Sequence, residues 1–222
     1  MTIETVISVL AVALTVVFAW PQVFRVLRHG VHGISVGAIT LSLVAASAWL
    51  GYGIARGLVP VIVANFGVMS GQLIVTLELT RHRALTRAGA AGAITAALVL
   101  IGVCQIPTLT EPIVVVAGLV AMTSVLTQLL EVVREPHALE GLSAGTYGIL
   151  ASVSACWVGY GLLTGDLVIV VTNAVILPMA AYITWAASRS HHELDEVGGN
   201  DEATASANSG RTSGPSASHG CA

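Results

Sequence analysis

The chain has 222 residues, of which 55% are hydrophobic, 9% are charged and 5% are aromatic, and its formal net charge is −3. A soluble domain carries about 25% charged residues, so this composition excludes disordered and collagen-like chains and disfavours an ordinary soluble enzyme. It also excludes a nucleic-acid-binding protein, because there is no basic patch to hold a polyanion. The sequence predicts a membrane protein whose partner is the lipid bilayer.

Seven apolar segments are long enough, or nearly so, to cross a bilayer as helices, which takes roughly 20 residues. In chain order they cover about residues 4–24, 34–55, 58–79, 88–105, 112–130, 143–164 and 167–187. The first lacks the positively charged start of a cleavable signal, so we expect it to remain as a span. From residue 188 onward Ser, Gly, Ala and acidic residues predominate, and such a composition predicts disorder.

The arginines predict the orientation, because cytoplasmic loops carry an excess of positive charge. With the N-terminus outside, seven arginines near span ends lie on the cytoplasmic side and only Arg56 lies outside. We therefore expect an integral protein of the cell (plasma) membrane with its N-terminus outside and its C-terminus in the cytoplasm.

An internal repeat organises the chain. A shift of 108 residues aligns more than ten identical residues, among them Trp49 with Trp157, Tyr52 with Tyr160, and Asn65 with Asn173. Each copy contains three spans, and the fourth span restores the orientation, so the copies are expected to be parallel. The predicted fold is an all-α membrane protein with seven transmembrane helices, two parallel three-helix repeats joined by a linker helix (3+1+3). The predicted units are 1–84, the first repeat; 85–107, the linker helix; 108–187, the second repeat; and 188–222, a disordered cytoplasmic tail.

The repeated Trp and Asn predict a binding site at the centre of the membrane. Trp49 and Asn65 each lie seven residues from the outer end of a span, which places them roughly 10 Å below the outer surface. Trp157 and Asn173 repeat this spacing, so all four are expected in one uncharged layer. An indole offers a flat apolar face to a sugar ring, and a carboxamide both donates and accepts hydrogen bonds. The alternative is that Trp marks the interface and Asn joins helices.

Charged and aromatic residues near the outer ends predict a gate. Tyr52 and Arg56 share one face of the second span, while Tyr160 and Asp166 occupy nearby positions in the second repeat. We expect Arg56 and Asp166 to form an ion pair when the outer mouth is closed. The alternative is that both charges only mark loop ends.

At the cytoplasmic end, Pro21 lacks an N–H and is expected to act as a hinge in the first span. Gln22 and its repeat counterpart Gln128 are expected to close that side through amide hydrogen bonds.

These residues carry a family resemblance. With Pro21-Gln22, the 3+1+3 layout and the paired Trp and Asn, residues 1–187 resemble the SWEET sugar transporters and the SemiSWEETs of the PQ-loop superfamily, as a two-repeat member of bacterial type. The resemblance implies that Trp49, Asn65, Trp157 and Asn173 line a sugar pocket, and that Tyr, Arg and Asp form an outer gate. The second repeat departs from the family pattern, because Thr127 stands where the pair has proline.

The expected function is facilitative uniport of a neutral mono- or disaccharide by alternating access. Proton coupling would need an ionisable residue within the membrane, and the acidic residues fall near span ends. Alternatives are a PQ-loop amino-acid carrier, with or without proton coupling, and a seven-helix receptor. An enzyme is not expected, since no nucleophile, metal or cofactor constellation occurs at depth. Oligomerisation is possible but not required, because two repeats complete a pathway within one chain.

Overall fold

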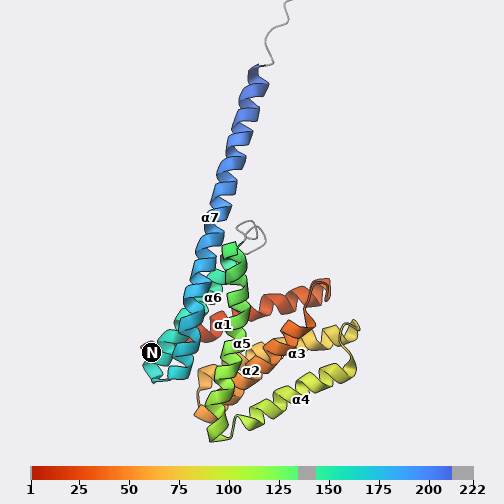
Figure 1. The fold of residues 1–222 in the computed structure, drawn as a ribbon, viewed down its shortest axis with the longest axis vertical. Helices are drawn as coiled ribbons and strands as arrows, with labels where there is room; N and C mark the ends of the chain where they lie inside the picture. Colours follow the sequence, from red (N-terminus) through yellow and green to blue (C-terminus); the bar gives the residue numbers. More distant parts are fainter. Residues whose placement is uncertain (1, 135–143, 212–222) are drawn as a thin grey trace, which may run out of the picture.

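The computed structural model describes residues 2–134 and 144–211, except for the side chains beyond Arg189 and a few in the second half of the fifth helix. Within these ranges the secondary structure is entirely helical. The helices, shown in Figure 1, are α1 (Ile3–His29), α2 (Val36–Arg56), α3 (Val59–Arg81), α4 (Arg87–Val103), α5 (Pro107–Arg134), α6 (Ala144–Thr164) and α7 (Leu167–Arg211).

The chain is an all-α membrane protein. Among the described residues, six helices are long and apolar enough to cross a bilayer, and α4 is a shorter apolar helix of 17 residues. At 1.5 Å per residue α4 is about 26 Å long, somewhat less than the hydrocarbon core of about 30 Å.

Two glycine turns build equivalent hairpins in the two halves of the chain. Gly57 ends α2 and Gly165 separates α6 from α7, with φ values of 67° and 71°. Glycine adopts this left-handed conformation without the steric penalty of a Cβ. The turns therefore bring Trp49 alongside Asn65, and Trp157 alongside Asn173, on antiparallel helices.

The helices form two groups of three. In the first triplet (α1, α2 and α3), α3 packs against both α1 and α2; in the second triplet (α5, α6 and α7), α7 packs against both α5 and α6. The triplets meet through α1 with α6 and α2 with α5, while α4 lies mainly against α2. The contacts between the triplets thus match the repeat, because α1 corresponds to α5 and α2 to α6.

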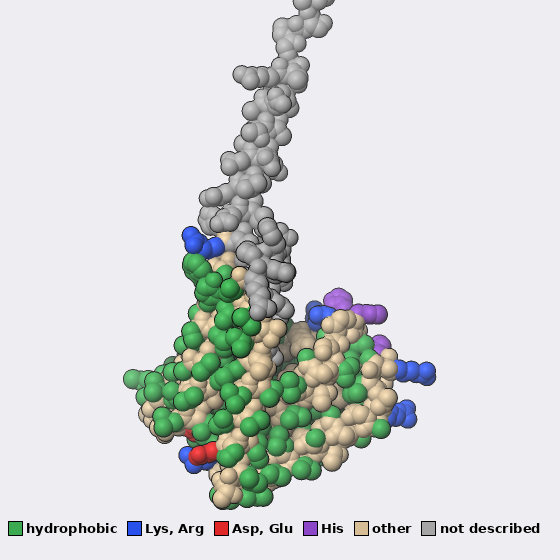
Figure 2. Space-filling model, in the orientation of Figure 1, with side chains coloured by type: hydrophobic (Ala, Val, Ile, Leu, Met, Phe, Trp, Pro, Cys, Tyr) green, Lys and Arg blue, Asp and Glu red, His purple; other side chains and the backbone are tan. Residues whose placement is uncertain are grey.

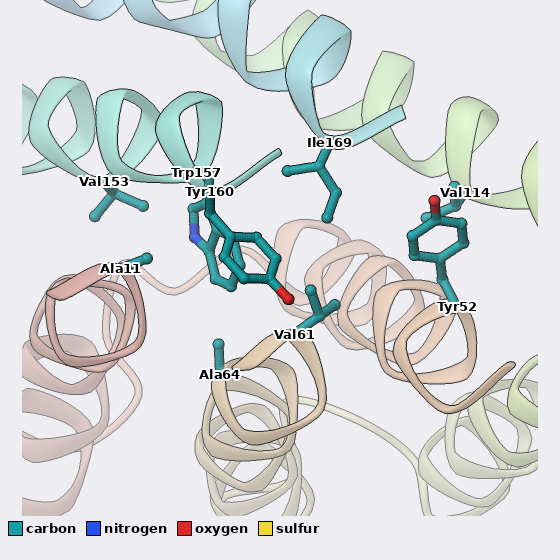
Figure 3. Close-up of a cluster of buried hydrophobic side chains, with 9 residues drawn as sticks. All are labelled: Ala11, Tyr52, Val61, Ala64, Val114, Val153, Trp157, Tyr160 and Ile169. Carbon is teal, nitrogen blue, oxygen red and sulfur yellow. The ribbon is translucent and has the colours of Figure 1, made fainter. Parts of the chain in front are cut away.

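Among the described side chains, the buried core joins the triplets at one end only. Nine side chains, drawn in Figure 3, form a cluster from both triplets: Ala11, Tyr52, Val61, Ala64, Val114, Val153, Trp157, Tyr160 and Ile169. We call this the closed end; it contains the N-terminus and both glycine turns. Toward the opposite, splayed end, one cluster around Val23 and Leu79 belongs to the first triplet and one around Ile183 to the second. Figure 1 shows α1 and α3 diverging from α5 and α7 in this direction.

The C-terminal helix extends further than expected. Helix α7 continues to Arg211, into a segment whose composition predicted disorder from residue 188. Its backbone ladder can continue because no proline, which would interrupt the hydrogen bonds, occurs between Pro178 and Pro215.

Close contact between α2 and α4 predicts a sharp difference between two glycines. A Cβ added at Gly51 lies 2.7 Å from Cys104 Cβ and 3.2 Å from the Ile101 backbone, whereas one at Gly92 meets nothing within 4 Å. We expect Gly51→Ala to lower the free energy of unfolding by about 1–3 kcal/mol, as overpacking does. Gly92→Ala should be neutral or raise it by up to about 1 kcal/mol. Unfolding both purified variants in detergent checks this; equal stabilities contradict it.

Candidate functional site

A cavity of about 160 Å³ lies between the two triplets at the inner edge of the closed end. It brings together all four residues predicted to form one layer. Its lining consists of Thr15, Trp49, Val61, Asn65, Gly118, Ala121, Val153, Trp157, Ile169, Thr172, Asn173 and Ile176. These residues come from six helices, three in each triplet, so the cavity exists only when the two triplets are assembled.

The cavity walls follow the internal repeat. Three pairs separated by 108 residues face it: Trp49 with Trp157, Asn65 with Asn173, and Val61 with Ile169. On α1 and α5 the separation is 106 residues, which pairs Thr15 with Ala121. The site is therefore nearly two-fold in shape but polar to different degrees on its two sides.

The two indole N–H groups differ in their partners. Trp157 Nε1 donates to Thr15 Oγ1 at 3.0 Å, and the Thr15 hydroxyl donates to the Ala11 carbonyl at 2.7 Å. This bond crosses from α6 to α1 and fixes the Trp157 ring. For Trp49 Nε1 the described residues provide no hydrogen-bond partner, although it lines the same cavity. The Trp49 side thus retains a donor for a bound molecule.

The two asparagines have the same geometry. Asn65 Nδ2 donates to the Val61 carbonyl and Asn173 Nδ2 to the Ile169 carbonyl, each at 2.9 Å. Each bond ties the amide to its own helix and leaves the Oδ1 atom as an acceptor without a partner among the described residues. Two asparagines and one tryptophan that line the cavity therefore keep a polar atom without a partner among the described residues, and most of the other lining side chains are apolar.

Neighbouring tyrosines orient both indoles. The Trp49 and Tyr52 rings lie 5.8 Å apart at 80°, and the Trp157 and Tyr160 rings lie 5.6 Å apart at 87°. Edge-to-face pairs of this kind contribute about 0.5–1.5 kcal/mol beyond the area they bury. Figure 3 shows Trp157 and Tyr160 side by side on α6.

A buried hydrogen bond links the triplets at the closed end. The Tyr52 hydroxyl lies 2.8 and 2.7 Å from the two carboxylate oxygens of Asp166 and donates its proton to them. Asp166 also accepts from the Ile169 backbone N–H at 3.1 Å, which places it at the start of α7 as a helix cap. Tyr52 is fully buried and Asp166 is 6% exposed. We call this contact the Tyr52–Asp166 latch.

The expected ion pair between Arg56 and Asp166 is not formed in this structure. Arg56 Nη1 instead lies 3.7 Å from Glu111 Oε1 near the start of α5, and both side chains are about half exposed. The physical reason is that the Asp166 carboxylate turns inward to cap α7 and meet Tyr52, while Arg56 ends α2 at the surface. An exposed pair of this kind contributes only about 0–1 kcal/mol.

The latch has no second copy. Tyr160 is equivalent to Tyr52, but the position equivalent to Asp166 is Leu58, which packs against the shared core. In the part of the chain that the structure describes, the Tyr160 hydroxyl forms no hydrogen bond. Only one of the two possible tyrosine–carboxylate contacts therefore closes this end.

The structure describes only part of the gate predicted at the cytoplasmic side. Pro21 lies inside α1, and Gln22 beside it is exposed. The side chain of Gln128 lies outside the described residues, so the expected amide contact remains a prediction.

Two hydroxyl-bearing residues of the cavity lining, Thr15 and Thr172, were not among the predicted site residues. The repeat has alanine opposite each of them, Ala121 and Ala64. Because neither hydroxyl has a counterpart in the other repeat, the comparison of the two repeats does not single it out. In addition, Ser and Thr in helices often bond only their own backbone. Their role depends on helix rotation, which the structure supplies.

Comparison with known protein families gives no matching family model, and comparison with curated proteins gives no significant match.

Proposed function

We propose that the protein is a facilitative transporter of a small neutral sugar, built as two parallel three-helix repeats with α4 as the linker. The observation that carries the proposal is the cavity between the triplets, lined by one Trp and one Asn from each. Indole faces suit the C–H surface of a sugar ring, and the free amide oxygens accept hydrogen bonds from its hydroxyls.

The division of the core supports alternating access. The triplets share a buried cluster at the closed end, while the clusters toward the splayed end belong to one triplet each. Rocking of the triplets about the central cavity could reverse this arrangement. The conformation described is then closed at the end that holds the latch and open toward the other.

Charge supports a cytoplasmic location for the splayed end. Arg28 and His29 end α1 there, and Arg81 ends α3 beside them. Figure 2 shows Arg and His side chains gathered in this region. Under the positive-inside rule the latch faces outside, the N-terminus is outside, and the cavity communicates with the cytoplasm.

The size and the lining of the cavity limit the class of solute that it can hold. A cavity of about 150 Å³ holds benzene, a single six-membered ring, so the cavity of about 160 Å³ fits one sugar ring better than two. No residue that lines it is ionisable at neutral pH. This favours a neutral monosaccharide over an amino acid, which carries two charges that would need partners.

We expect Asn65→Ala and Asn173→Ala each to reduce hexose uptake into proteoliposomes by about fivefold to 150-fold. Each substitution removes an acceptor for a hydroxyl of the bound sugar, and a hydrogen bond left unmade costs about 1–3 kcal/mol. Ser70→Ala is the matched control, since Ser70 also bonds its own helix, to the Phe66 carbonyl, but does not line the cavity.

A panel of labelled monosaccharides, disaccharides and amino acids identifies the solute class in the same experiment. Monosaccharide uptake that depends on both asparagines, without accompanying proton flux, supports the proposal. Uptake of amino acids alone, or hexose uptake unchanged in both asparagine variants, contradicts it.

A further inference from the structure

A second cavity lies at the splayed end of the first triplet, where α3 turns into α4. Its volume is about 740 Å³, and Arg81, Arg83 and Arg87 line it together with Thr86 and Leu77. Nothing in the transport mechanism uses these side chains. Three guanidinium groups around one cavity form a site for a multivalent anion, because each can donate two parallel hydrogen bonds to a phosphate.

The positive charge at this cavity is only partly compensated. Glu78 lies 3.5 Å from Arg81 Nη1 and 3.6 Å from His82 Nε2. Neither Arg83 nor Arg87 takes part in an ion pair within the described part of the chain. At least two guanidinium groups are therefore available to an external anion.

The local backbone adds to this positive charge. Arg87 begins α4, where the helix dipole is positive and a cation is unfavourable, and the first turn of α4 contains no acidic residue. Arg83 has a φ of 58°, which is uncommon for a residue other than glycine. This conformation places Arg83 on the cavity with Arg81 and Arg87. A bound anion would offset the electrostatic cost of this arrangement, and the α4 N-terminus would contribute backbone N–H groups.

The cavity lies where a lipid headgroup would be found. Helix α3 is a candidate span and α4 is only 17 residues long, so both should end near the boundary of the hydrocarbon core. Leu77 lines the cavity and is 59% exposed, so it provides an apolar surface for the upper part of an acyl chain. A free inorganic anion would make no use of that surface.

We propose that this cavity binds the phosphate of an anionic phospholipid, with phosphatidylglycerol as the probe. A zwitterionic lipid fits less well, because its ammonium or choline group would face the guanidinium groups. This inference does not depend on the transported solute.

The test is native mass spectrometry of the full-length protein released from mixed phosphatidylglycerol–phosphatidylcholine micelles. We expect wild-type protein to retain phosphatidylglycerol preferentially, and Arg83→Gln with Arg87→Gln to lower that enrichment by about tenfold to thirtyfold. The control, Arg28→Gln with Arg189→Gln, removes the same charge from exposed positions near the same membrane face. It should change the enrichment by less than about twofold.

Two further arms make the test decisive. Arg83→Lys with Arg87→Lys keeps the charge but loses bidentate bonding. This variant replaces the glutamine pair if that pair does not fold. We expect it to lower the phosphatidylglycerol enrichment by about twofold to fivefold. Inorganic phosphate alone should give no adduct that depends on Arg83 and Arg87. The proposal is overturned if the site-directed and control pairs behave alike, or if phosphate binds with this dependence and the lipid does not.

Discussion

Tyr52→Phe is expected to weaken the closed end by about 1–3 kcal/mol. The substitution keeps the ring that packs against Trp49 and the shared core but removes the hydroxyl that lies 2.8 and 2.7 Å from the Asp166 oxygens. Asp166 then remains buried with the Ile169 N–H as its one described donor. A buried group deprived of its partner costs about 1–3 kcal/mol, and a charged one is at the upper end.

Hydrogen–deuterium exchange of the α6–α7 turn measures this effect locally. The amides of Asp166 and Val170 are bonded to the Gly161 and Asp166 carbonyls at 2.8 and 3.1 Å. They should exchange about fivefold to 150-fold faster in Tyr52→Phe if local opening governs exchange. Amides in the middle of α3 should be unaffected.

Tyr160→Phe is the matched control. Tyr160 is nearly as buried as Tyr52 and contacts its own Trp in the same edge-to-face geometry, but its hydroxyl makes no hydrogen bond among the described residues. We expect little change in exchange at the α6–α7 turn. If the two tyrosine variants have equal effects, the latch has no special role and the ring packing alone holds this end.

Leu58→Asp is expected to strengthen the closed end and to slow transport. Leu58 directly precedes α3 and provides no side-chain cap for it. In the internal repeat, its position is equivalent to that of Asp166. An aspartate there can cap α3, which contributes about 0.5–2 kcal/mol. It can also accept a hydrogen bond from Tyr160, which recreates the latch on the opposite side. A charged hydrogen bond adds about 1.5–3 kcal/mol. The equilibrium between the two conformations should therefore shift toward the one with the latched end closed, by about tenfold to 150-fold.

A double-mutant cycle separates these two contributions. Leu58→Asp in the Tyr160→Phe background keeps the cap and loses the new latch, so the difference isolates the tyrosine–carboxylate pair. We expect slower hexose uptake only where Tyr160 is present. Slower uptake in both backgrounds assigns the effect to the cap and contradicts a gating role for the second latch.

The single latch has a consequence for transport under the proposed function. An interaction of about 1–3 kcal/mol biases a two-state equilibrium by about fivefold to 150-fold, so the open state remains populated enough to be visited. A second, equal latch would square that bias. The replacement of the second carboxylate by Leu58 therefore keeps the gate reversible.

The sequence by itself determined the features that depend on local pattern. Apolar runs bounded by charge and glycine defined the helices. The reason is that a helix buries its apolar residues in lipid whichever helix packs beside it. The repeat placed Trp49 and Asn65, and Trp157 and Asn173, at matching depths, since depth follows from rise per residue along a straight helix. The structure brings all four around one cavity.

Only the tertiary structure decided which polar groups meet. Asp166 turned toward Tyr52 and Arg56 toward Glu111, although the sequence places all four near the same end of the predicted bundle. Successive side chains along a helix point in directions about 100° apart. A small change in the rotation or tilt of one helix therefore exchanges one side-chain partner for another. The Trp157–Thr15 bond and the arginine-lined cavity depend on the same rotations and on the chain direction at the α3–α4 turn. Depth in the membrane is therefore encoded locally, whereas the pairing of side chains is set by how the helices turn toward one another.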